Sequence, residues 1–206
     1  NGEGLCGHLD VSGCTALEEL NCQGNQLKEL DVSGCTALER LYCSNTQLEE
    51  LDVGDCIALK SVGCSYNQLK EFDASDCIAL EDLYCFNNQL KELNVTDCRA
   101  LVVLWCIGND LTELNVSDCT ALETLSCYNN QLTFSTLPLL DISDYLYSPQ
   151  EKLVIGTAGK ILVDESIDLS SEAEVEGEFT KFYWYAGEDE TSSTLPLLDI
   201  SDYLYS

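Results

Sequence analysis

Apolar residues recur along residues 9–133 with a fixed period of 21 residues. Six copies follow one another without a gap, and they begin at Leu9, Leu30, Leu51, Phe72, Leu93 and Leu114. A short fixed period predicts one structural unit stacked on itself, in which each coil buries its apolar positions against its neighbours. We therefore expect a solenoid of six 21-residue coils over residues 9–133.

Each copy contains two segments with the alternation of a β-strand. In the second copy, the first segment places Leu41 and Cys43 on one face and Tyr42 on the other. The second segment, at the start of each copy, alternates in the same way and predicts a second inward row. An amide residue recurs where the first segment ends, as Asn25, Asn67, Asn88, Asn109 and Asn130, with Thr46 as the exception. A buried amide can bond the backbone of successive turns, which explains this row without any function.

The spacing Leu-x-x-Leu-x-Cys-x-x-Asn-x-Leu resembles the leucine-rich repeat. The nested 21-residue form resembles a bacterial subclass known as IRREKO repeats, and the resemblance covers residues 9–133. It implies a mostly β fold, namely a right-handed leucine-rich-repeat solenoid with parallel sheets on both sides. It also implies a secreted or cell-surface protein of bacteria. It implies no particular ligand, because such repeats bind very different partners.

The remaining residues flank the solenoid. Residues 1–8 form an incomplete N-terminal coil, an uncapped edge through which the chain could form an oligomer. Residues 134–150, with two of the three prolines, are expected to form a cap or linker. Residues 151–206 contain short alternating segments, the longest over residues 172–185, and predict a small antiparallel β-sandwich-like domain. They resemble a partial immunoglobulin-like module found in surface proteins of gut bacteria.

The last 14 residues repeat an earlier segment. Residues 193–206 match residues 135–148 letter for letter, whereas the solenoid copies differ from one another. Two copies of one apolar segment could compete for the same groove and lead to strand exchange between molecules. Sequence alone leaves open whether this duplication is natural.

Twelve of the thirteen cysteines fall into two series at the repeat period. The series are Cys14, Cys35, Cys56, Cys77, Cys98, Cys119 and Cys22, Cys43, Cys64, Cys85, Cys106, Cys127. Neighbours in such a ladder lie about 4.8 Å apart with parallel Cα–Cβ directions, whereas a disulfide needs converging Cβ atoms about 3.5–4.5 Å apart. We expect these twelve to be buried free thiols, with a disulfide or metal ladder as the alternative. No Cys-x-x-Cys pair accompanies the single histidine, His8, so a zinc site has little support.

The net charge is −28, from 37 acidic and 9 basic residues. This charge disfavours nucleic acids and anionic membranes as partners. No apolar run approaches the roughly 20 residues of a membrane span, and no signal peptide is visible, so we expect no membrane insertion. The outward positions of the second segment are mostly acidic and predict a solvated acidic face, with Ca²⁺ binding as the alternative. These positions are Asp10, Asp31, Asp52, Asp73, Asn94 and Asn115.

The outward positions of the first segment contain the candidate binding residues. They are Tyr42, Tyr84, Phe86, Trp105, Ile107 and Tyr128. Solvent-facing aromatic residues that gather on one surface are typical of an interaction site. Cross-strand stabilisation of the sheet, or packing of the C-terminal domain, are the alternatives. We expect a binding module that recognises a protein or a glycan, and the second hypothesis is a self-assembling structural protein.

An enzyme is disfavoured by the same pattern. The carboxylates lie in open ladders with no enclosed pocket to shift a pKa, and the cysteines are expected to point inward, away from any base. We therefore expect no catalytic residue, no metal-binding residue and no cofactor.

Overall fold

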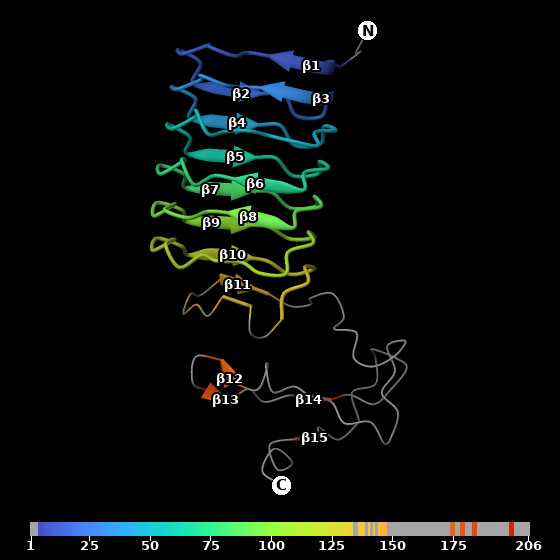
Figure 1. The fold of residues 1–206 in the computed structure, drawn as a ribbon, viewed down its shortest axis with the longest axis vertical. Coiled ribbons are helices and arrows are strands. Elements are labelled where there is room, and N and C mark those ends of the chain that lie inside the picture. The colour runs from blue at the N-terminus through green and yellow to red at the C-terminus, as the bar shows by residue number, and fades with distance from the viewer. Residues whose placement is uncertain are drawn as a thin grey trace. The chain divides into compact units, whose positions relative to one another are not determined.

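The structure is a computed structural model of the 206-residue chain. It describes residues 4–133, 136–138, 140, 142 and 144–147, and the backbone of residues 174–175, 178–179, 183–184 and 198–199. The chain divides into two compact units, Asn1–Leu153 and Val154–Ser206. The first unit is a stack of coils built from parallel strands (Figure 1), so the prediction of a mostly β solenoid is confirmed. Among the described residues, no helix has the length and apolar character needed to cross a membrane.

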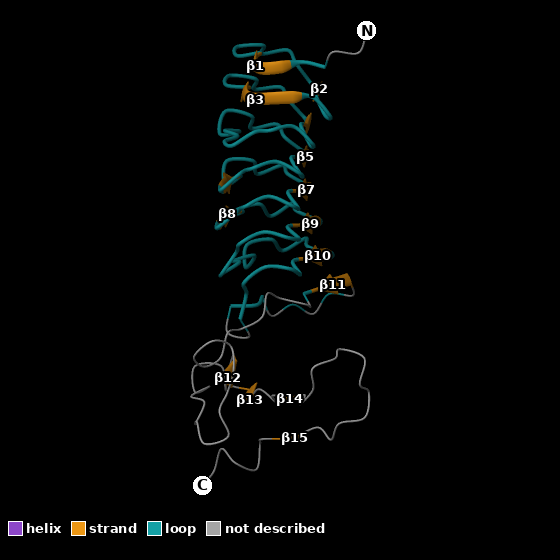
Figure 2. Ribbon diagram, turned by 90° about the vertical axis from the view of Figure 1, so that its right-hand side faces the viewer, coloured by secondary structure: helices purple, strands orange, loops and turns teal. Residues whose placement is uncertain are grey.

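One side of the stack carries a parallel sheet of seven strands (Figure 2). In order along the sheet, the strands are β2 (Glu19–Asn21), β4 (Arg40–Tyr42), β5 (Ser61–Gly63), β7 (Asp82–Tyr84), β9 (Val103–Trp105), β10 (Thr124–Ser126) and β11 (Asp144–Leu146). Each of the first six strands pairs with the equivalent strand of a neighbouring coil, so these paired residues lie one repeat apart in the sequence. The central residues therefore form one row of partners, namely Leu20, Leu41, Val62, Leu83, Leu104 and Leu125.

The opposite side carries less strand structure than the predicted continuous sheet. The described strands form two parallel pairs, β1 (Cys6–Asp10) with β3 (Gln26–Asp31) and β6 (Glu71–Asp73) with β8 (Glu92–Asn94). Each of these strands ends at an Asp or Asn whose side chain accepts the backbone N–H two residues further on. This local bond takes up a backbone N–H just beyond the strand, which fits the end of each strand at this residue.

The inward positions form one continuous apolar core. Leu83, Cys85, Leu104 and Cys106 are all fully buried. The amide of Asn109 joins two coils, since its Nδ2 donates to the carbonyls of Cys85 and Cys106 at 3.1 and 2.9 Å and its Oδ1 accepts from Leu90 N–H at 3.0 Å. Asn67, Asn88 and Asn130 make the same three bonds in their own coils. The predicted amide ladder is confirmed.

Eleven of the thirteen cysteines are buried and all thirteen are free thiols. The prediction that all twelve ladder cysteines are buried is wrong for Cys14, which is exposed, as is Cys6. Cys14 lies in the first coil, where only one neighbouring coil is present among the described residues to cover it. Cys35, one coil further on, is buried, and its thiol donates to the carbonyl oxygen of Val11 at 3.2 Å.

Strand β11 continues the sheet beyond the last repeat. It pairs in parallel with β10, and Cys127 N–H donates to the Leu146 carbonyl at 2.8 Å. The hydroxyl of Tyr145 donates to the Pro138 carbonyl at 2.8 Å, and the Tyr145 ring packs against the core. This segment thereby covers apolar side chains at the end of the sixth coil.

In the second unit, the described strands form two antiparallel pairs. They are β12 (Glu174–Val175) with β13 (Glu178–Phe179), and β14 (Tyr183–Trp184) with β15 (Leu198–Asp199). Strands β12, β13 and β14 lie within residues 172–185, the longest of the alternating segments in the sequence. Otherwise, the predicted immunoglobulin-like module and the duplicated segment 193–206 lie outside the described residues.

Candidate binding site

The outward face of the seven-stranded sheet presents aromatic rings on neighbouring strands. Leu83 and Leu104 point into the core, so strand alternation turns Tyr84 and Trp105 outward. These two residues are partners in the register of β7 and β9. Their rings meet edge to face, with centroids 5.3 Å apart and planes at 87°, which is a favourable arrangement for two aromatic rings.

Two further rings extend this contact along the sheet. Phe86 lies 6.3 Å from Trp105 between ring centroids, and Tyr66 meets Phe86 edge to face at 5.2 Å. We call Tyr66, Tyr84, Phe86 and Trp105 the aromatic cluster. It spans coils three to five, and Tyr66 and Trp105 are 55% and 38% exposed.

The other predicted site residues lie around this cluster. Tyr42 lies against Gly63 on the neighbouring strand, where a Cβ atom would come within 3.2 Å of the Tyr42 ring. Gly63 therefore leaves room for the Tyr42 ring. Ile107 and Tyr128 are half-buried and follow the inward Cys106 and Cys127, as Phe86 follows its own cysteine.

Tyr66 is the member of the cluster that the sequence pattern does not predict. It has a φ of 56°, in the left-handed region that a bulky residue rarely adopts. The same position in the other coils holds only glycine or asparagine: Gly24, Asn45, Asn87, Gly108 and Asn129. In the sequence, the one sign of this feature was a tyrosine at a position that otherwise holds residues suited to positive φ.

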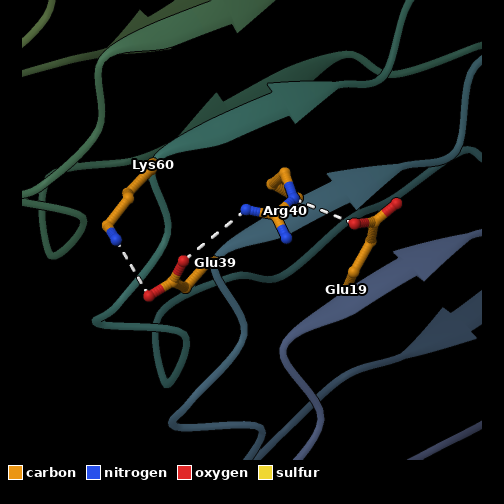
Figure 3. Close-up of polar contacts among 4 residues, drawn as sticks. All are labelled: Glu19, Glu39, Arg40 and Lys60. Carbon is orange, nitrogen blue, oxygen red and sulfur yellow. Dashed lines mark hydrogen bonds and ion pairs between the residues drawn. The ribbon is translucent and has the colours of Figure 1, made fainter.

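The sheet face in the first three coils carries a chain of ion pairs (Figure 3). Arg40 bridges Glu19 at 2.9 Å and Glu39 at 3.6 Å, and Lys60 reaches Glu39 at 2.8 Å. Each such exposed pair contributes only about 0–1 kcal/mol. Their main effect here is to neutralise Glu19 and Glu39 on this face.

Asp82 lies beside the aromatic cluster without such a neutralising partner. Burial raises the pKa of its carboxyl, and the nearby charge of Glu81 adds to this effect. Burial also raises the pKa of the Tyr84 hydroxyl, with further contributions from the charges of Asp82 and Tyr42. The Asp82 carboxylate therefore interacts electrostatically with the Tyr84 hydroxyl of the aromatic cluster.

A hollow of about 430 Å³ on the opposite side of the stack is a second candidate site. It is lined by Glu50, Leu51, Asp52, Glu71, Phe72, Asp73, Glu92 and Asn94. Its Asp and Asn oxygens already accept backbone N–H groups, as in the 2.9 Å bonds of Asp52 with Gly54 and of Asp73 with Ser75. No group of three or more His, Cys, Asp or Glu side chains suited to a metal occurs among the described residues. Asp73 and Asn94 thus have a structural role at the ends of β6 and β8.

Comparisons with known proteins agree with this architecture. Residues 15–53 match a family model described as leucine-rich repeats in two copies. Among solved structures, the chain is similar to the functional domain of InlJ from Listeria monocytogenes, described as including a cysteine ladder. The two share 30% sequence identity with a TM-score of 0.60, over 84% of this chain and 38% of that chain. A comparison with curated proteins finds no match. The chain thus contains leucine-rich repeats.

Proposed function

We propose that the solenoid is a non-catalytic binding module of a secreted or cell-surface bacterial protein. It holds a protein or a glycan against Tyr42, Tyr84, Phe86, Trp105, Ile107 and Tyr128, and Tyr66 joins this surface. The observation that carries the proposal is the contact of four aromatic rings on the solvent side of the sheet. The similarity to the InlJ domain supports a surface location.

The solenoid does not need these rings in order to fold. The position of Tyr84 and Trp105 is occupied by Asn21, Gly63 and Ser126 in other coils of the same sheet. Tyr66 costs backbone energy where asparagine or glycine would not. Rings that other coils omit, one of them in a strained conformation, are best explained by contact with a partner.

Replacement of Trp105 by alanine is expected to reduce binding about 30-fold or more, because central aromatic residues of an interface contribute about 2 kcal/mol or more. The free energy of unfolding should fall by only about 1–2 kcal/mol, because two aromatic contacts are lost from a solvent-facing position. Ligands are first selected with the full chain from a random-peptide phage library and a printed glycan array. Affinities for the selected ligands and urea unfolding curves are then measured for both proteins.

Two further variants sharpen this test. Ile78→Ala removes an apolar side chain that is 65% exposed outside the sheet strands, and it should leave the affinity unchanged. Tyr66→Asn introduces the residue that coils two, four and six carry, so it should weaken binding without loss of stability. If Trp105→Ala and Tyr66→Asn bind the selected ligands as well as the unmodified chain does, the proposal is wrong.

A further inference from the structure

Charge is distributed unevenly along the outward face of the seven-stranded sheet. In coils one to three, the strand segments 18–24, 39–45 and 60–66 carry three acidic and two basic residues. Both basic residues pair with Glu19 or Glu39, as Figure 3 shows. In coils four to six, segments 81–87, 102–108 and 123–129 carry Glu81, Asp82 and Glu123 and no basic residue. The half of the face that carries most of the aromatic cluster is therefore the half without its own cations.

Asp82 holds the central place in this arrangement. It precedes Tyr84 by two residues on β7, so both side chains lie on the same face of the sheet. Its register partners, Ser61 and Val103, are uncharged. The adjacent segment of this face in coil three carries one cation, Lys60, and its Nζ lies 2.8 Å from Glu39. Asp82 forms no ion pair with any residue within the described part of the chain.

From this arrangement we infer that the aromatic cluster binds an arginine side chain of a positively charged polypeptide partner, with the guanidinium between the Asp82 carboxylate and the rings of Tyr84 and Trp105. This inference rests on the proposed function and specifies its partner. Arginine fits both parts of the site, because its planar group stacks on aromatic faces and bonds carboxylate oxygens in pairs. The net charge of −28 attracts a cationic partner over a longer range.

Other partners fit the described charges less well. An acidic polypeptide or a sulfated or sialylated glycan would bring more negative charge to a face that already holds three unneutralised carboxylates. A neutral sugar would stack on the rings but leave Asp82 without a cation. Lysine would satisfy the carboxylate but lacks the planar group that stacks on Trp105.

The test uses the ¹⁵N-labelled full chain and three probes at 150 mM NaCl, which screens weak contacts with the remaining acidic surface. The probes are acetyl-Gly-Arg-Gly-Arg-Gly-amide, the same peptide with citrulline in place of arginine, and maltotriose. The arginine peptide should shift the NMR signals of Tyr84, Phe86 and Trp105. It should bind about fivefold or more tightly than the citrulline peptide, which has the same shape without the charge.

Two matched variants remove one negative charge each. Asp82→Asn should weaken the arginine peptide about fivefold and leave the citrulline peptide unchanged. Asp52→Asn, on the opposite side, should change the affinity less than twofold, and asparagine already occupies this position in coils five and six. Equal losses for both variants, equal affinity for both peptides, or shifts confined to the acidic side would overturn the inference.

The inference and the proposed function fail in different ways. If Trp105→Ala abolishes binding of library-selected ligands while Asp82→Asn has no effect on the arginine peptide, the binding module stands and the cationic partner does not. Stronger shifts of the cluster signals by maltotriose than by the arginine peptide lead to the same conclusion. If Trp105→Ala leaves the selected ligands bound, the proposed function itself is wrong.

Discussion

Replacement of Asn109 by alanine is expected to lower the free energy of unfolding by about 2–3 kcal/mol, because a buried backbone N–H that loses its partner costs about 1–3 kcal/mol and two further hydrogen bonds to shared carbonyls are lost. The N–H of Leu90 loses its side-chain partner. The carbonyls of Cys85 and Cys106 each lose one bond but keep the bond from the Nδ2 of Asn88 and of Asn130. Asn109 is 4% exposed, so water has little access to replace the lost amide. Urea unfolding followed by far-UV circular dichroism measures the change.

Two other variants define the cause of this loss. Gln89→Ala removes an exposed amide from the preceding coil and should cost less than about 0.5 kcal/mol. Asn109→Thr should fall between the two, because Thr46 in the second coil bonds its own coil's Cys43 carbonyl at 3.0 Å. Were Asn109→Ala as stable as Gln89→Ala, the amide ladder would not hold the coils together.

Replacement of Leu104 by alanine is expected to lower the free energy of unfolding by about 3–4 kcal/mol, the cost of a fully buried leucine that leaves a cavity. Leu104 is 0% exposed at the centre of β9, and its register partners Leu83 and Leu125 are equally buried. Neighbouring coils hold the backbone in place on both sides, so the cavity cannot easily collapse.

The control for this variant keeps the volume of the side chain. Leu104→Met should cost less than about 1.5 kcal/mol, because methionine fills nearly the same space. Both variants are compared by the same urea titration. A small loss for Leu104→Ala would mean that the row of central strand residues does not form a close-packed core.

The sequence predicts the solenoid well because each coil repeats the same inward positions. Leu104, Cys106 and Asn109 recur at fixed spacing in most coils, and only a stacked unit buries all of them at once. The period therefore predicts the side of each strand that faces the core, and with it the outward position of Tyr84. The predicted immunoglobulin-like module has no comparable repetition to support it.

The repeat pattern does not predict features that depend on a single coil. Cys14 occupies an inward position, but it lies in the first coil and is exposed. Tyr66 occupies a turn position that usually holds Asn or Gly, so the pattern gives no reason to place its ring against Phe86. In both cases, the residues next to the side chain in the folded structure determine whether it is exposed or in contact.

The candidate site is predictable in part. The outward aromatic residues follow from strand alternation, whereas the importance of Asp82 requires knowing that Lys60 turns to Glu39 in the coil before it. On the opposite side, the predicted continuous sheet is reduced to two strand pairs, although the bond from an Asp or Asn to the backbone N–H two residues further on recurs in all six coils. The ion pair of Lys60 is not periodic, because no other coil has a lysine at this position.

The cysteines give the most direct test of the central claim, which is that the repeat fixes the inward positions and leaves the outward ones free for binding. Burial raises the pKa of Cys64, Cys77 and Cys98 to about 12, so these thiols stay protonated and unreactive at neutral pH.

The measurement counts modified thiols in the native, reduced full chain by mass spectrometry after treatment with iodoacetamide at pH 7.5. The account predicts rapid modification of two thiols, Cys6 and Cys14, and modification of all thirteen only after unfolding in urea. Rapid labelling of most of the thirteen in the native chain would contradict the inward assignment, and the outward placement of the aromatic cluster would be contradicted with it.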